Sequence, residues 1–326
     1  MEPILILALI IGFVLSYSFT TLWRDMAQKK GLLGKDMHKK DGRGVAEAGG
    51  IAFLTSFILI VLFYILANVF LFKSDTNVIE LFALLCSILI AGFIGFSDDI
   101  IGWKIGLNKL SRVFLLLFAS IPLVVINAGV STVLGIEFGI IFPLVLIPIG
   151  IVGTTATFNF LAGFNGLEAS QGILIIGALS IVYYLNGVTW LTFVLASMVV
   201  CLLGFYFLNK WPAKVFPGDV LTYPVGAMIA IAAILGNMEK IAIFFFIPYI
   251  IEVGLKVRGK LKKESFAKLS EEGGLELPYE KLYSLTHVAI WILKKFKKRV
   301  YEREVVYLIN AFQILIILLG FLFVLG

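Results

Sequence analysis

Hydrophobic residues run along this chain in long blocks separated by short polar segments. Each block is close to the ~20 residues that an α-helix needs to cross the hydrocarbon core of a bilayer. The pattern predicts ten spanning helices, at residues 3–23, 46–72, 79–97, 109–127, 138–158, 169–185, 188–208, 220–236, 240–256 and 304–325. Pro143 and Pro148 interrupt the fifth block, so we expect a broken helix there. The expected fold class is all-α, a polytopic membrane protein with about ten transmembrane helices.

The composition supports this assignment. Hydrophobic residues make up 60% of the chain and charged residues 15%, whereas soluble domains are about 45–50% apolar and about 25% charged. The first block lacks a basic leading segment and is longer than a signal-peptide core, so we expect it to be the first spanning helix. With no internal repeat and no separate soluble stretch, residues 1–326 are expected to form a single integral membrane domain.

Positive charge is concentrated on alternate connecting segments. Apart from Lys73 and Lys240, every Lys and Arg falls in one set of polar segments or in the helix starts that follow them: 24–45, 98–109, 159–168, 209–219 and 257–303. The positive-inside rule places that set in the cytoplasm and both termini outside the cell membrane. The net charge of +6 therefore indicates membrane topology, and we expect no nucleic acid partner.

The largest cytoplasmic segment is residues 257–303. Apolar residues recur there at helical spacing and precede a basic cluster; they are Leu282, Leu285, Val288, Trp291 and Ile292, followed by Lys294, Lys295, Lys297, Lys298 and Arg299. This pattern is typical of an amphipathic helix on the inner leaflet, with its cations at the level of the lipid phosphates. A solvated basic loop is the alternative.

Two adjacent carboxylates end the third hydrophobic block. Asp98 and Asp99 are costly to desolvate beside an apolar helix, and paired carboxylates suit Mg²⁺, which also takes phosphate oxygens and water. Lys109 begins the next block, close to Arg112, and could hold a diphosphate as a point charge. An ordinary interfacial aspartate pair and a positive-inside lysine are the alternatives.

Two further polar clusters lie on the same side of the membrane. In the first, Asn159 could offer an amide oxygen to a metal, and Asn165 and Glu168 could bind the hydroxyls or the imide of a ligand; an interhelical turn is the alternative. In the second, Asp219 is either a helix N-cap or a third metal carboxylate, and Phe216 could stack on a nucleobase. Together these clusters describe a Mg²⁺–diphosphate site at the lipid boundary.

Other titratable residues are expected to be structural. Glu252, late in the ninth block, is expected to pair with a lysine such as Lys256. His38 and His287 have no metal-like neighbours in sequence and are interpreted as interfacial residues.

These motifs resemble those of the polyprenyl-phosphate N-acetylhexosamine-1-phosphate transferases, especially their archaeal and eukaryotic dolichyl-phosphate branch. The matching segments span the chain in order: GLLGKDMHKK at 31–40, GFSDD at 95–99, the region of Lys109, NFLAGFNGLEASQG at 159–172, KVFPGD at 214–219, and Tyr301-Glu302-Arg303. The resemblance implies ten transmembrane helices and a cytoplasmic active site.

The resemblance also implies roles for the polar residues. Asn159 and Asp219 would bind Mg²⁺, for which Mn²⁺ could substitute, and Lys109 would hold the diphosphate. Asp98 and Asp99 would serve the lipid phosphate or position the metal. A polyprenyl phosphate oxygen would attack the sugar-linked phosphorus of a UDP-sugar, and UMP would leave.

On the nucleotide side, the resemblance implies that Gly163, Asn165 and Phe216 contact the uridine and that Glu47 lines the same region. It also admits a homodimer. One departure is the segment 257–287, which lacks the His- or Arg-rich cluster that grips the substrate in relatives, and this leaves the sugar contacts open.

UDP-N-acetylglucosamine is the preferred donor, with UDP-N-acetylmuramoyl-pentapeptide as the alternative. Direct displacement is preferred to a covalent aspartyl intermediate. A secondary transporter, which would need midplane carboxylates and repeated halves, and a catalytically silent scaffold are the competing classes.

Overall fold

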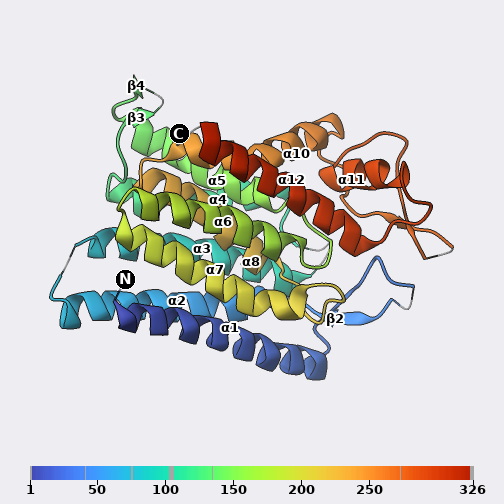
Figure 1. The fold of residues 1–326 in the computed structure, drawn as a ribbon, viewed down its shortest axis with the longest axis horizontal. Helices are drawn as coiled ribbons and strands as arrows, with labels where there is room; N and C mark the ends of the chain where they lie inside the picture. The colour runs from blue at the N-terminus through green and yellow to red at the C-terminus, as the bar shows by residue number, and fades with distance from the viewer. Residues whose placement is uncertain are drawn as a thin grey trace.

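The computed structural model describes residues 2–40, 42–74, 76–102, 106–133, 135–271 and 273–323. It is a bundle of long helices that run in alternating directions (Figure 1). The α-helices are α1 (Pro3–Lys30), α2 (Gly50–Leu66), α3 (Val78–Ile101), α4 (Lys109–Val125), α5 (Ile147–Phe158), α6 (Leu167–Leu185), α7 (Thr189–Asn209), α8 (Asp219–Leu235), α9 (Glu239–Phe245), α10 (Ile247–Arg258), α11 (Leu285–Lys294) and α12 (Glu302–Phe323).

The described strands are short and occur only as antiparallel pairs. β1 (Leu33–Lys35) pairs with β2 (Gly44–Ala46), β3 (Thr132–Val133) with β4 (Ile136–Glu137), and β5 (Lys268–Leu269) with β6 (Leu275–Glu276). Two π-helical turns, η1 (Ala67–Leu71) and η2 (Phe142–Leu146), extend α2 and precede α5. The fold is therefore mainly helical, and the short hairpins lie in the connections between helices.

Every predicted hydrophobic block contains a helix. The expected break in the fifth block is wrong: η2 and α5 form one uninterrupted helical run over Phe142–Phe158. Its start is π-helical, and a proline stands in the first turn of each piece. The ninth block is two helices, α9 and α10, with Pro248 near the start of the second. α1 continues seven residues beyond the predicted end of its block, because Arg, Met, Ala, Gln and Lys are good helix formers, and it stops at Gly31, whose φ is 73°.

The core is built around α8. Residues 220–234 of this helix are all buried, and it packs against α2, α3 and α5. The outer helices expose apolar side chains instead: Leu7 and Ile10 on α1 are 54% and 57% exposed, and Leu322 on α12 is 68% exposed. Within the part of the chain that the structure describes, six helices are long and apolar enough to span a membrane. Apolar outer faces on such helices are what contact with lipid requires.

The two chain ends lie at one end of the bundle, and the connections that carry the polar motifs lie at the other (Figure 1). The predicted amphipathic helix is observed as α11, which buries Leu285 while Trp291 remains 44% exposed. Its contact with the inner leaflet stays a prediction.

Candidate active site

The start of α8 is held by a carboxylate from α3. Asp99 accepts hydrogen bonds from the main-chain nitrogens of Asp219 at 2.8 Å and Val220 at 3.0 Å. These are two of the N–H groups that a helix leaves unpaired at its start, and the negative charge complements the positive end of the helix dipole. Asp99 is therefore a capping residue supplied from another helix.

Two glycines permit this close contact. A Cβ at Gly218, whose φ is 69°, would lie 2.2 Å from Asp99 Oδ2, and one at Gly95 would lie 2.4 Å from the Asp219 carbonyl oxygen. Gly218 is also the N-cap residue of α8. The interpretation of Asp219 as the N-cap is thus wrong, and its carboxylate is available for another role.

The Asp219 carboxylate shares a guanidinium with Asp98. Arg112 Nη2 lies 2.6 Å from Asp98 Oδ2, and Arg112 Nη1 lies 3.7 Å from Asp219 Oδ2. Asp98 Oδ1 also accepts a hydrogen bond from the Leu107 main-chain nitrogen at 2.6 Å. α3, α4 and α8 therefore bring two carboxylates and one cation together, as the location of the motifs on one side of the membrane predicts.

Arg112 is the residue that sequence reasoning undervalued. Lys109 was the expected cation, but Arg112 lies one helical turn further along α4 and makes both ion pairs. Its spacing of three residues from Lys109, which puts both on one face of the helix, was the available signal. Lys109 Nζ instead donates to the Leu261 carbonyl oxygen in the connection that follows α10.

Asn159 completes this group from the end of α5. Its Nδ2 donates to Asp219 Oδ1 at 2.9 Å, and its Oδ1 accepts from the Thr222 hydroxyl at 3.2 Å. Asp98, Asp219 and Asn159 carry carboxylate and amide oxygens, which are the ligand types that Mg²⁺ prefers. The Asn159 amide, whose Nδ2 points to Asp219, would turn over to present its oxygen to a cation beside Asp219. Asp99 contacts the Asp219 main-chain nitrogen, so three carboxyl groups and one guanidinium lie close together. A divalent cation fits that donor set.

The turn after Asn159 is closed by Glu168. Its Oε1 accepts from the Gly163 main-chain nitrogen at 2.7 Å, and the side chain is buried. Gly163 has a φ of 98°, and a Cβ there would lie 2.6 Å from the Phe266 ring. A residue other than glycine would be strained at this position. The structure thus gives Glu168 a contact that shapes the loop.

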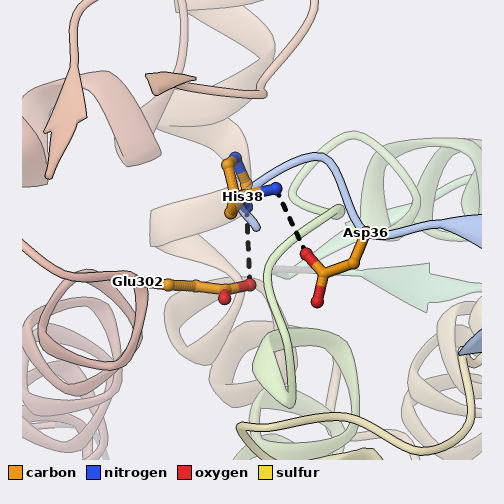
Figure 2. Close-up of side chains that lie close together, drawn as sticks. All are labelled: Asp36, His38 and Glu302. Atoms are coloured by element: carbon orange, nitrogen blue, oxygen red, sulfur yellow. Dashed lines mark hydrogen bonds and ion pairs between the residues drawn. The ribbon is translucent and has the colours of Figure 1, made fainter. Parts of the chain in front are cut away.

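Asn165 is held by carboxylates from two distant segments. Its main-chain nitrogen donates to Glu302 Oε1 at 2.7 Å, and its Nδ2 donates to Asp36 Oδ2 at 3.1 Å. Asp36, His38 and Glu302 form a buried group (Figure 2), so the prediction that His38 has no metal-like neighbour is wrong. It failed because 264 residues separate His38 from Glu302.

Glu47 and Phe216 lie where two connections run side by side. The Phe216 nitrogen donates to the Ala46 carbonyl at 2.7 Å, and the Gly49 nitrogen donates to the Phe216 carbonyl at 2.9 Å. Burial raises the pKa of the Glu47 carboxyl above its ordinary value, and its charge acts on Asp99. The two expected nucleotide-side residues are thereby brought to one edge of the site.

The structural assignment of Glu252 is confirmed. Lys256 Nζ lies 3.7 Å from Glu252 Oε1, and Glu252 Oε2 accepts from the Leu285 nitrogen at 2.6 Å, which ties α10 to α11. Burial lowers the pKa of His287 to about 4. This imidazole is therefore neutral near pH 7, and it lies outside the one His–carboxylate group found among the described residues.

Comparison with known proteins finds relatives over most of the chain. The profile of glycosyl transferase family 4 matches residues 81–237, from α3 to just beyond α8. A Sulfolobus acidocaldarius protein provisionally named UDP-N-acetylglucosamine–dolichyl-phosphate N-acetylglucosaminephosphotransferase is 33% identical over 98% of this chain and 96% of its own length. A Saccharolobus solfataricus protein with the same provisional name is 36% identical over 88% of each chain.

A eukaryotic relative extends the match. The Dictyostelium discoideum UDP-N-acetylglucosamine–dolichyl-phosphate N-acetylglucosaminephosphotransferase is 29% identical over 73% of this chain and 68% of its own length. The family profile covers the motifs of α3, α5 and α8, and Arg112 pairs with carboxylates from α3 and α8. With near-complete coverage at 33% identity, this chain belongs to the sugar-phosphate transferases of glycosyl transferase family 4.

Proposed function

We propose that this protein transfers N-acetylglucosamine 1-phosphate from UDP-N-acetylglucosamine to a polyprenyl phosphate of the dolichyl type and releases UMP. The observation that carries the proposal is the convergence of Asp98, Asp219 and Asn159 beside Arg112 in a chain of this family. Carboxylate and amide oxygens next to a guanidinium suit a metal-bound diphosphate.

In this proposal Asp98, Asp219 and Asn159 hold Mg²⁺, or Mn²⁺ in its place. The bound cation would neutralise charge on the diphosphate as the phosphorus–oxygen bond breaks. Arg112, which contacts both carboxylates, would hold phosphate oxygens beside them. Asp99 has a positioning role: it accepts hydrogen bonds from the first main-chain nitrogens of α8 and so fixes the helix start that carries Asp219.

The reaction is a single displacement. An oxygen of the polyprenyl phosphate forms a bond to the sugar-linked phosphorus, and the bond from that phosphorus to the UMP phosphate oxygen breaks. The nucleophile is already an anion near neutral pH, so the protein must chiefly align the reactants and balance their charge. On the donor side, Asn165, Gly163, Phe216 and Glu47 would surround the uridine.

An open groove on α4 would accept the polyprenyl chain. It has a volume of about 300 Å³ and is lined mostly by apolar side chains from α4 and from the η2–α5 helix, namely Phe114, Leu117, Phe118, Ser120, Ile121, Val124, Leu144 and Pro148. Phe114 lies two residues after Arg112, so the groove begins at nearly the same level along the α4 axis but on another face of the helix. A polyprenyl tail in the groove would have to pass around α4 for its phosphate to reach Arg112.

The proposed topology has ten spanning helices, both termini outside and the active site in the cytoplasm. It is supported by the concentration of Lys and Arg on the connections at the site end of the bundle and by the position of both chain ends at the opposite end (Figure 1). The homodimer admitted by the resemblance stays a prediction.

The direct test is UMP release by the detergent-purified protein with UDP-N-acetylglucosamine, dolichyl phosphate and Mg²⁺. Release should require the lipid and stop with EDTA. Activity only with UDP-N-acetylmuramoyl-pentapeptide would change the assigned donor. No release with any UDP-sugar, together with UDP binding, would favour a silent scaffold, and tracer uptake into sealed vesicles would favour a transporter.

A further inference from the structure

We infer that Asp36, His38 and Glu302 form a buried clamp that positions Asn165 for uridine recognition. The inference rests on the proposed function and extends it to three residues that act through another side chain. They come from separate parts of the chain: Asp36 and His38 lie between β1 and β2, and Glu302 is the first residue of α12. Figure 2 shows the three side chains converging.

The clamp grips Asn165 at two points. Glu302 Oε1 accepts from its main-chain nitrogen at 2.7 Å, and Asp36 Oδ2 accepts from its side-chain Nδ2 at 3.1 Å. An ionised carboxylate can only accept a hydrogen bond, so Asp36 determines which end of the Asn165 amide faces it. The amide oxygen is left to face away from Asp36.

That orientation has a chemical consequence. An amide oxygen can accept from the imide N–H of uracil, whereas cytosine has an acceptor at the same ring position. A site built around a buried hydrogen-bonding group rejects a ligand that leaves the group unpaired. By fixing the amide, Asp36 would therefore set the preference for uridine over cytidine nucleotides.

His38 stabilises the clamp through contacts with three segments. Its Nε2 accepts from the Ala267 main-chain nitrogen at 3.1 Å, so the proton is on Nδ1, which lies 3.4 Å from Glu302 Oε1. The imidazole also packs against Phe164, with ring centroids 4.4 Å apart. The side chain thus links the start of α12, the Asn165 turn and the connection after α10.

One lysine already neutralises part of the charge of the two carboxylates. Lys39 Nζ lies 2.5 Å from Glu302 Oε2 and 3.6 Å from Asp36 Oδ2. A metal ion there would compete with this ammonium, and His38 has already committed both ring nitrogens. The three side chains thus already have hydrogen-bond and ion-pair partners, and a buried network of this kind holds its side chains rigidly.

The clamp is separate from the phosphate site. Among the described residues, no hydrogen bond or ion pair joins Asp36, His38 or Glu302 to Asp98 or Asp219. The three residues should therefore affect binding of the nucleotide and leave the chemical step unchanged.

The test compares matched variants in steady-state UMP release. Glu302→Ala leaves the Asn165 N–H without its acceptor, whereas Glu302→Gln keeps an oxygen in the same place. Losing a hydrogen bond to a buried charged group corresponds to about tenfold or more in binding. We expect KM for UDP-N-acetylglucosamine to rise about tenfold or more in Glu302→Ala and much less in Glu302→Gln. The kcat value and the KM for dolichyl phosphate should stay within about twofold.

Asp36→Asn tests the amide orientation. Its new side chain can present either an oxygen or an NH₂ to Asn165, so the Asn165 amide can turn over. We expect the ratio of inhibition by UDP to inhibition by CDP to fall about tenfold. Asp25→Asn is the control, because Asp25 is half-exposed at the same end of the bundle and contacts only Arg24 among the described residues.

The outcomes separate the two proposals. If the wild-type protein does not release UMP, the proposed reaction fails, and UDP and CDP binding by calorimetry still tests the clamp. If the variants lose thermal stability and kcat together, with KM and the UDP-to-CDP ratio unchanged, the clamp is only structural and the inference is overturned. Equal effects of Glu302→Ala and Glu302→Gln on KM would also overturn it.

Discussion

Removing the Asp99 carboxylate should destabilise the protein through α8. Asp99→Ala leaves the N–H groups of Asp219 and Val220 without acceptors at the start of a buried helix. A hydrogen bond to a charged group contributes about 1.5–3 kcal/mol. Because Asp99 is partly exposed, water can replace part of the loss, and we expect a decrease of about 3 kcal/mol in the free energy of unfolding. Asp99→Asn keeps one acceptor oxygen and should lose about half as much.

The assay is chemical denaturation in detergent micelles, followed by UMP release at a series of Mg²⁺ concentrations. Asp99→Asn should need more Mg²⁺ for half-maximal activity because Asp219 is less well placed. Asp219→Asn should abolish turnover with little loss of stability, since its ion pair to Arg112 is long at 3.7 Å. Ser97→Ala is the control, because the one described hydrogen bond of that hydroxyl goes to the Phe93 carbonyl of its own helix. Wild-type stability of Asp99→Ala together with complete loss of turnover would refute the capping role and make Asp99 a direct participant.

Four further changes test other parts of the site. Arg112→Lys should lower kcat about tenfold or more, because one ammonium cannot bridge Asp98 and Asp219 as two guanidinium nitrogens do; wild-type UMP release would contradict this. Gly163→Ala should cost about 1–3 kcal/mol in unfolding free energy because its φ is 98°, and unchanged stability would show that the loop can relax. His287 has a pKa lowered to about 4 from 6.5 by burial, so the unfolded chain binds the extra proton first and stability should fall as the pH drops from 6.5 toward 4; His287→Gln should flatten that part of a denaturation–pH profile. Ile121→Trp should fill the α4 groove and raise KM for long-chain polyprenyl phosphate while leaving KM for the UDP-sugar unchanged, and a rise in both would place the lipid elsewhere.

The hydrophobic pattern was sufficient to predict where a helix lies in each block. Each block is a local property of consecutive residues, and a bilayer requires that each span satisfy its own backbone hydrogen bonds. The pattern could not locate the end of α1, because the polar residues up to Lys30 continue the helix beyond the apolar block. It did locate an irregular part of the fifth helix, since the π-helical turn η2 lies at Pro143 and α5 begins beside Pro148.

For the candidate site too, the sequence determined some features and the tertiary structure determined the others. The sequence alone determined that Asp98, Asn159 and Asp219 lie at one end of the bundle, because helices of similar length alternate in direction. Only the tertiary structure decided that Asp99 caps α8, that Arg112 joins two carboxylates, and that Asp36, His38 and Glu302 meet at Asn165. Apart from the Asp98–Arg112 pair, these contacts join residues 107 to 264 positions apart, and no local pattern of polarity encodes the side-chain directions that bring such residues within hydrogen-bonding distance.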